Sequence, residues 1–204
     1  MSLKKNSIFT LSLLLCLGLA ACGTQKNTTT SKKETKTEHK TSKIKKKISS
    51  SSSSVTPDPN ASERPWTYDH DVYDAGIETY RFTKWEVRDS SQKDKKALVL
   101  YCDVTNNSTK EQDPSNVFMV VHAFQKNETS DVQLDPGTVS LDNDGNNPLQ
   151  KYDDGLHNML LPGKTVKAVM VFTLNNDKPV RVTFEDPEFN VIGVKNYNVA
   201  DKMK

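Results

Sequence analysis

The 204-residue sequence has little cysteine, and its N-terminal apolar run is too short to cross a bilayer. This run, residues 8–21, has 14 residues, whereas a membrane-spanning helix needs about 20. Only three cysteines are present, at positions 16, 22 and 102. Because the first two belong to the N-terminal segment, Cys102 has no partner in the rest of the chain, and we expect no intrachain disulfide.

Several motifs of common catalytic sites are also missing. The sequence has no Gly-x-Ser-x-Gly nucleophile elbow and no His-x-x-x-His metal-binding pair. Gly163-Lys164-Thr165 resembles the end of a phosphate-binding loop, but Asn158 replaces the earlier glycine that such a loop requires. These absences predict a protein that is not an enzyme and that holds no resident cofactor.

The N-terminus has the order of a bacterial lipoprotein signal peptide. A basic head is followed by the apolar run and then by Leu19-Ala20-Ala21-Cys22. This pattern predicts a signal peptide over residues 1–21, cleavage before Cys22 and attachment of two fatty acyl chains, such as palmitate, to the Cys22 thiol. Each buried CH₂ contributes about 0.8 kcal/mol, so two or three chains anchor firmly. We therefore expect a lipid-anchored protein on the extracellular face of the cell membrane.

Residues 22–65 have the composition of a tether that follows the lipidated cysteine. Residues 24–64 contain ten Lys and Arg but only four Asp and Glu, a net charge of about +6, and almost no apolar side chains. Such a segment cannot bury enough surface to offset its chain entropy, so we predict disorder. The lysines either contact anionic lipid or wall polymer, or form a solvated spacer. No aromatic stacking pattern accompanies them, so we predict no nucleic-acid partner.

Residues 66–204 differ in charge and in pattern, and we predict one folded domain there. They carry 16 basic and 22 acidic residues, a net charge of about −6, and their length suffices for one core. The apolar residues recur with a period of two, which is typical of strands. In residues 97–104, Leu98, Leu100, Cys102 and Val104 share one face. This placement predicts that Cys102 is a buried, unreactive thiol.

Strand patterns recur along the whole domain and are separated by turn residues. They are predicted over residues 76–87 (with a break near 83–84), 97–104, 117–124, 132–134, 139–141, 165–174, 180–184 and 189–194. We find no convincing amphipathic helix. About seven or eight short strands predict an all-β fold, an antiparallel sandwich, with a small closed barrel as the alternative.

Three segments resemble an uncharacterised lipoprotein family of Gram-positive bacteria, a domain of unknown function. They are the strand that ends in Thr105-Asn106-Asn107-Ser108, the Ala123-Phe124-Gln125 segment, and Leu161-Pro162-Gly163-Lys164-Thr165 before a late strand. The resemblance covers roughly residues 77–184. That family is similar to the immunoglobulin-like sandwich of a small secreted mycobacterial antigen. The resemblance therefore implies an immunoglobulin-like fold and a surface location, and it carries no catalytic residues.

One polar loop has some features of a calcium site. Asp142, Asp144, Asn146 and Asp153 fall at positions one, three, five and twelve of a calcium-binding loop. Gly145, however, stands at position four, where the pattern wants glycine at six. An ordinary polar turn is the alternative interpretation, since Asn, Asp and Gly dominate turns.

Five aromatic residues precede or lie within the first predicted strand: Trp66, Tyr68, Tyr73, Tyr80 and Trp85. Such residues either stack on sugars and anchor a protein partner, or fill the core and its lid.

Our leading hypothesis is a non-enzymatic extracellular interaction module that binds an unknown protein or glycan. The second is an envelope lipoprotein that binds calcium or a small ligand, and the third is an envelope hydrolase.

Overall fold

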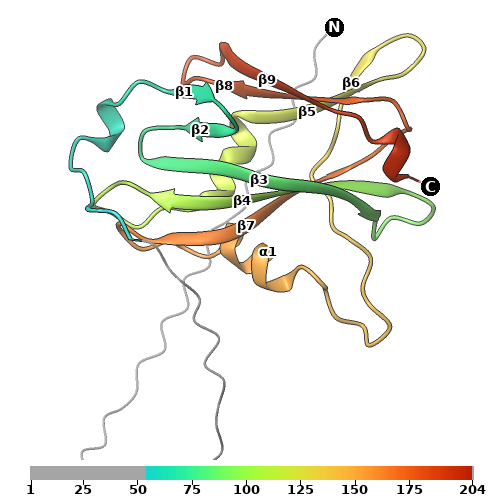
Figure 1. Ribbon diagram of the computed structural model, residues 1–204, viewed down its shortest axis with the longest axis horizontal. Coiled ribbons are helices and arrows are strands. Elements are labelled where there is room, and N and C mark those ends of the chain that lie inside the picture. Colours follow the sequence, from blue (N-terminus) through green and yellow to red (C-terminus); the bar gives the residue numbers. More distant parts are fainter. Residues whose placement is uncertain (1–53, 204) are drawn as a thin grey trace, which may run out of the picture. The chain divides into compact units, whose positions relative to one another are not determined.

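The computed structural model describes residues 54–203, which form two antiparallel sheets (Figure 1). The five-stranded sheet has the order β1-β2-β3-β4-β7, and the four-stranded sheet has the order β6-β5-β8-β9. The strands are β1 (Thr67–Asp69), β2 (Val72–Asp74), β3 (Glu78–Asp89), β4 (Lys96–Asn106), β5 (Val121–Lys126), β6 (Asp131–Gln133), β7 (Thr165–Thr173), β8 (Val180–Glu185) and β9 (Val191–Tyr197). The predicted all-β sandwich is confirmed, with nine strands in two separate sheets rather than one closed sheet.

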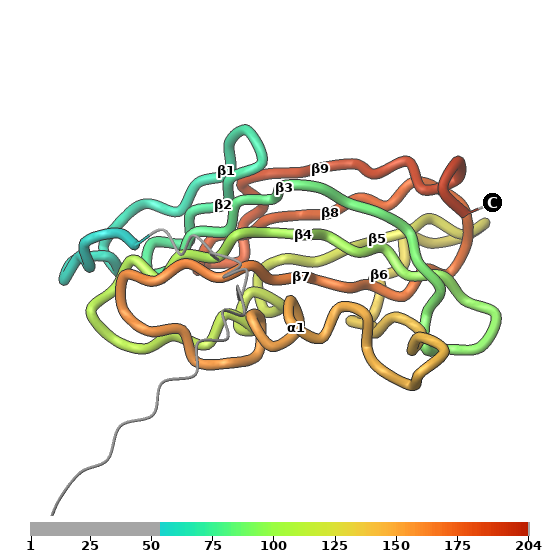
Figure 2. Tube along the Cα trace, turned by 60° about the horizontal axis from the view of Figure 1, so that its bottom comes forward, coloured from blue at the N-terminus to red at the C-terminus, as the bar shows by residue number. Residues whose placement is uncertain are grey.

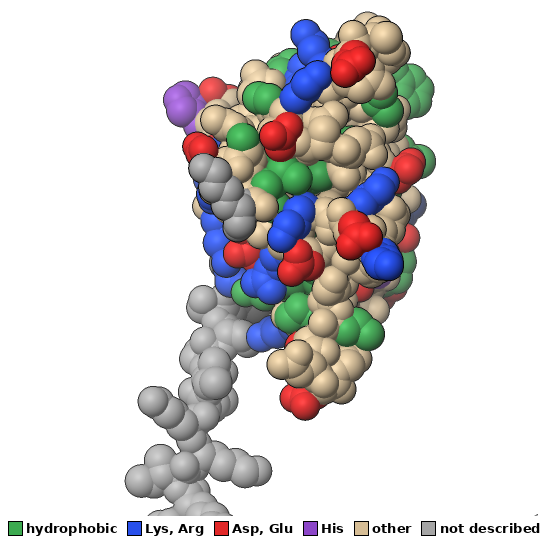
Figure 3. Space-filling view, turned by 90° about the vertical axis from the view of Figure 1, so that its right-hand side faces the viewer, with side chains coloured by type: hydrophobic (Ala, Val, Ile, Leu, Met, Phe, Trp, Pro, Cys, Tyr) green, Lys and Arg blue, Asp and Glu red, His purple; other side chains and the backbone are tan. Residues whose placement is uncertain are grey.

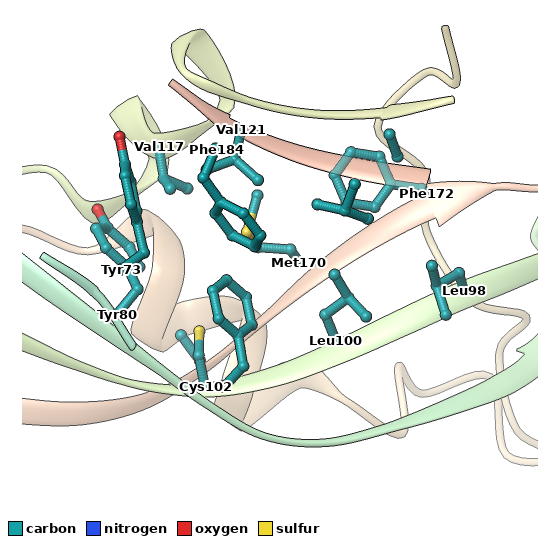
Figure 4. Close-up of a cluster of buried hydrophobic side chains, with 14 of the residues drawn as sticks. Tyr73, Tyr80, Leu98, Leu100, Cys102, Val117, Val121, Met170, Phe172 and Phe184 are labelled. Atoms are coloured by element: carbon teal, nitrogen blue, oxygen red, sulfur yellow. The ribbon is translucent and has the colours of Figure 1, made fainter. Parts of the chain in front are cut away.

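The main core lies between the two sheets. Leu98, Leu100 and Cys102 of β4 are buried there, and β8 contributes Val182 and Phe184 from the opposite sheet (Figure 4). Because side chains alternate along a strand, Val99 and Tyr101, which lie between these residues in β4, face away from this core. Cys102 is a free and buried thiol, as predicted, and burial raises its pKa to about 12.

The only α-helix of residues 54–203, α1 (Gln150–His157), lies beside β7, the edge strand of the five-stranded sheet, next to the outer face of that sheet (Figures 1 and 2). Val99, Tyr101 and Val169 pack there in a second buried cluster that includes Leu149. This helix was not predicted, because α1 buries only one residue of its own, Leu156, and so shows little apolar periodicity.

Several strand predictions were wrong. Residues 117–119 belong to the 3₁₀-helix η2 (Pro114–Met119), and the strand begins only at Val121. Residues 139–141 form no strand, because only Val139 pairs, in an isolated bridge with Ser90. The two short strands β1 and β2 were not predicted. The break predicted in β3 is confirmed by a register shift between Phe82 and Lys84.

The folded part also begins earlier than the predicted boundary at residue 66. Val55 N–H donates to the Gly163 carbonyl at 2.9 Å, and Asp58 N–H donates to the Asn107 carbonyl at 2.7 Å. Ala61, in the 3₁₀-helix η1 (Ala61–Glu63), is buried. Residues 54–65 therefore belong to the domain rather than to the predicted tether, because their backbone finds hydrogen-bond partners on it. The predicted signal peptide, Cys22 and most of the tether lie outside the described residues.

Candidate functional site

The motifs that carry the family resemblance meet at one end of the five-stranded sheet, where β4 ends and β7 begins. Asn106 is fully buried, and its Nδ2 donates to the carbonyls of Lys110 and Leu160, both at 2.7 Å. Its Oδ1 accepts from the backbone N–H and the hydroxyl of Ser108, both at 2.9 Å. Every polar atom of this side chain is satisfied, so the motif holds loops in place rather than binding a ligand.

The turn at residues 161–165 docks against the same motif. Gly163 N–H donates to the Asn106 carbonyl at 2.9 Å, and Asn106 N–H donates to the Lys164 carbonyl at 3.0 Å. Gly163 has a φ of +68°, and a Cβ at this position would lie 2.3 Å from the Val55 carbonyl oxygen. The glycine is therefore required by backbone conformation and by close approach, and not by phosphate binding.

The predicted calcium ligands are not brought together. Asp142 Oδ1 accepts the backbone N–H groups of Asp144 and Asn146, at 3.0 and 2.8 Å, which makes the segment an ordinary polar turn. Asp153 lies instead on α1. Within residues 54–203, no three His, Cys, Asp or Glu side chains are grouped so that they could hold a metal ion. The spacing in the sequence resembled a calcium loop, but the helix carries the last predicted ligand away from the turn.

One hollow, of about 450 Å³, lies beside α1 and includes Ser91, Asp153 and His157 in its lining. The Ser91 hydroxyl lies 2.6 Å from Thr138 Oγ1, and His157 Nδ1 lies 3.0 Å from the Asp153 carbonyl oxygen. These three residue types could form a hydrolytic triad, and His157 Nδ1 also lies 3.5 Å from Asp153 Oδ1, but Ser91 bonds to Thr138 and not to His157. In the described part of the chain, no hydroxyl or thiol hydrogen-bonds to a histidine ring. This hollow therefore lacks an activated nucleophile.

A second hollow of about 170 Å³ has a more distinctive chemistry. We call it the Glu78 pocket. Its lining is apolar apart from Glu78, Asn116 and the tyrosine hydroxyls, and it combines residues of β2, β3, η2 and the segments between them: Trp66, Tyr73, Ala75, Ile77, Glu78, Tyr80, Asn116, Val117, Met119 and Val120. Figure 4 shows Tyr73, Tyr80 and Val117 together at one end of the buried cluster, far from Leu98. An apolar pocket with few polar groups is the usual form of a binding site.

The strand pattern explains how a carboxyl group reaches this pocket. Glu78, Tyr80 and Phe82 alternate along β3 and all three are buried on the face toward the opposite sheet. Glu78 retains only 5% of its accessible surface, and its Oε1 has no hydrogen-bond partner. Burial is the main reason that its pKa rises from 4.5 to about 7. The hydrogen bond with Tyr80 opposes this rise, and the negative charge of Asp113 adds to it.

The corner that precedes Glu78 is held rigidly. Gly76 has a φ of +71°, and a Cβ there would lie 2.6 Å from the Ala61 carbonyl oxygen. Gly76 N–H donates to Asp74 Oδ1 at 3.0 Å, and Asp74 also forms an ion pair with Arg64. Close packing of η1 against this corner therefore fixes the pocket wall between Trp66 and Glu78.

The rim of the pocket differs from its floor in exposure. Tyr73, Tyr80 and Val117 are almost fully buried, whereas the Met119 side chain is 62% exposed and Trp66 is half-buried. A large exposed methionine beside an aromatic ring is adaptable to different partners. The molecular face in Figure 3 differs from this apolar rim. Acidic and basic side chains are interspersed on it, and neither charge sign dominates an area.

Sequence analysis identified the aromatic residues of this pocket but not its acid. Three of the five predicted aromatics, Trp66, Tyr73 and Tyr80, line the pocket, while Tyr68 stacks on Phe184 with ring centroids 3.9 Å apart. The available signal for Glu78 was its position, because it shares one strand face with Tyr80 and Phe82. A charged residue on an inward-facing position is rare unless it is paired or functional.

Comparisons with known proteins agree with this fold. A candidate lipoprotein from Staphylococcus aureus is similar with a TM-score of 0.55 and 15% identity, over 66% of this chain and 92% of the other. A protein from Enterococcus faecalis is similar with a TM-score of 0.51 and 17% identity, over 68% of this chain and 96% of the other. At these identities the likeness shows the fold.

The search of curated proteins finds no match. Within residues 54–203, no helix has the length and apolar character needed to span a membrane. The family model of DUF5067, a domain of unknown function, matches residues 52–186, which include all three segments that carry the resemblance. The chain therefore belongs to the DUF5067 family.

Proposed function

We propose that this protein is a non-enzymatic binding module, held by lipid on Cys22 at the extracellular face of the cell membrane, and that the Glu78 pocket receives an apolar group of its partner. The signal-peptide pattern around Leu19-Ala20-Ala21-Cys22 supports the location. The Staphylococcus aureus protein of similar fold, described as a candidate lipoprotein, supports it as well.

The observation that carries the binding role is the pocket itself. It places a buried carboxyl group with an unpartnered oxygen under an apolar opening, at a cost to stability that a purely structural core would avoid. Groups that destabilise a fold in this way occur preferentially at functional sites. Met119 and Trp66 at the rim add exposed apolar surface that a partner would cover.

Site-specific photo-cross-linking on intact cells tests this proposal. A benzophenone amino acid is introduced at Met119 in the full-length lipoprotein, and in a second strain at Met159, which is similarly exposed at 55% but does not line the pocket. We expect a discrete adduct from position 119 and none from position 159. Equal labelling at both positions, or no adduct at position 119, would contradict the proposed site.

A further inference from the structure

The size of the Glu78 pocket limits what it can hold. Its volume is about 170 Å³. An engineered apolar cavity of about 150 Å³ in another protein takes up one benzene molecule. The Glu78 pocket therefore has room for one ring or one branched alkyl group. A larger ligand would leave the rest of its body outside, against the rim at Trp66 and Met119.

The hydrogen bonds below the pocket fix where protons must lie. The Tyr80 hydroxyl oxygen is 2.8 Å from Glu78 Oε2 and 2.9 Å from the Pro114 carbonyl oxygen. Tyr80 has a single proton and a carbonyl only accepts, so the contact with Pro114 is a full hydrogen bond only when Tyr80 donates that proton to it. Glu78 Oε2 can then bond to Tyr80 only if the carboxyl group is protonated and donates. Both contacts are satisfied together by one arrangement, in which Glu78 donates to Tyr80 and Tyr80 donates to Pro114.

This arrangement leaves one specific vacancy in the hydrogen bonding. In a protonated Glu78 with its proton on Oε2, the other oxygen, Oε1, is a carbonyl-type acceptor, and it has no partner. An unpaired buried acceptor costs about 1–3 kcal/mol. A donor brought in by a ligand would remove this cost and would extend the chain of hydrogen bonds, each of which polarises the next.

We propose that the Glu78 pocket selects a neutral ring or branched alkyl group that carries one hydrogen-bond donor, and that this donor completes a chain through Glu78 and Tyr80 to the Pro114 carbonyl. This inference rests on the proposed binding role of the pocket. Glu78 Oε1 has almost no exposed surface in this structure, so a seated ligand meets it through a small shift of the carboxyl group toward the cavity.

A cationic ligand fits the pocket less well than a neutral one. An ammonium group would require Glu78 to ionise, and an ionised Glu78 can no longer donate to Tyr80. The single Tyr80 proton could then form a hydrogen bond with either Glu78 or Pro114, but not with both. The apolar walls would offer the ammonium group few other acceptors. A buried ion pair without such additional hydrogen bonds rarely recovers the free energy lost on desolvation.

Three small probes separate these alternatives. Phenol carries a ring and a neutral donor, benzene carries only the ring, and benzylammonium carries a positive charge. Binding is measured by NMR on residues 22–204 with Cys22→Ser, which retain every described residue. The reporters are the Trp66 indole N–H and the Met119 methyl group. Trp85 and Met159, which do not line the pocket, serve as internal controls.

Two variants of Glu78 test the hydrogen-bond chain. Glu78→Gln keeps the chain intact, because its amide N–H can donate to Tyr80 while its carbonyl accepts from the ligand. Glu78→Met keeps the approximate size but removes both functions. We expect wild type and Glu78→Gln to share the same preference for phenol over benzene. In Glu78→Met this preference should fall about tenfold, the effect of one hydrogen bond.

The outcomes distinguish the inference from the proposed function. If no probe shifts Trp66 or Met119, the pocket is not a binding site, and both proposals fail. If the probes bind but Glu78→Met keeps the wild-type preference for phenol, the donor inference alone is wrong. If benzylammonium binds most tightly and Glu78→Gln abolishes its binding, the pocket recognises a cation, which also overturns the inference.

Discussion

Glu78 and Asn106 lie directly opposite each other on the paired strands β3 and β4, and both are buried, yet they differ in how their polar atoms are satisfied. Asn106 uses both ends of its amide, with bonds to Leu160, Lys110 and Ser108. Glu78 bonds only through Oε2, and its Oε1 has no partner. The amide closes the end of the sheet, while the carboxyl group leaves one acceptor unused beside a pocket.

This difference separates a structural polar group from a candidate functional one. A fully satisfied buried network makes the fold specific and is stable by itself. A half-satisfied one destabilises the protein until a partner completes it. Both residues are buried to a similar degree. They differ only in whether all their donors and acceptors have hydrogen-bond partners.

The largest expected effect comes from breaking the satisfied side of the comparison. Asn106→Ala removes four hydrogen bonds, two donated to the carbonyls of Leu160 and Lys110 and two accepted from the N–H and hydroxyl of Ser108. We expect the free energy of unfolding to fall by about 4 kcal/mol, since each of the four lost hydrogen bonds contributes about 1 kcal/mol. Urea denaturation followed by circular dichroism measures this change. A loss below about 1 kcal/mol would show that the network is dispensable.

The fold could be predicted largely because its strands alternate cleanly. Leu98, Leu100, Cys102 and Val104 marked the inward face of β4 correctly. The short strands β1 and β2, with three residues each, carry too few positions to show a period. Helix α1 was missed for another reason. It approaches β7 closely at Gly155, where a Cβ would lie 2.3 Å from the Lys167 carbonyl oxygen, and it buries only one side chain of its own, Leu156.

The candidate site could be predicted only in part. The aromatic cluster at Trp66, Tyr73 and Tyr80 was visible in the sequence, but its meeting with η2 depends on tertiary packing. The raised pKa of Glu78 depends on the same packing, because it arises mainly from burial. Conversely, the acidic loop at Asp142 had a suggestive spacing, but its carboxylate bonds its own backbone. In a sequence alone, a polar turn of this kind therefore has the same residue spacing as a metal site, because the hydrogen bonds that occupy its carboxylate are not apparent.

The second largest expected effect is a dependence of stability on pH that arises from Glu78. Burial raises the pKa of Glu78 to about 7 in the folded state, above its ordinary value of 4.5. Between these values the unfolded chain releases the proton while the folded protein keeps it, so stability falls as pH rises toward 7. Relative to pH 4.5, the wild type should lose about 3 kcal/mol by pH 8 through this group.

Glu78→Gln is the matched control, because it retains the hydrogen bond to Tyr80 and cannot ionise. Denaturation curves of both proteins between pH 4.5 and 8 should diverge, with Glu78→Gln becoming the more stable above pH 7. The other titrating groups are common to both proteins and cancel in the difference. Parallel stability profiles would mean that Glu78 titrates normally and is not held as a neutral acid.

The smallest effect is the coupling between Glu78 and Tyr80, and it tests the direction of the chain. Tyr80→Phe removes the hydroxyl that lies between Glu78 Oε2 and the Pro114 carbonyl. We expect a double-mutant cycle of Tyr80→Phe with Glu78→Met to give a coupling of about 1 kcal/mol at pH 5, where Glu78 is protonated. With Glu78→Gln in place of the wild-type residue, the cycle should give a similar value, because the amide also donates to Tyr80. If the coupling is instead much larger with glutamate than with glutamine, Tyr80 donates to an ionised Glu78, and the proposed direction of the chain is wrong.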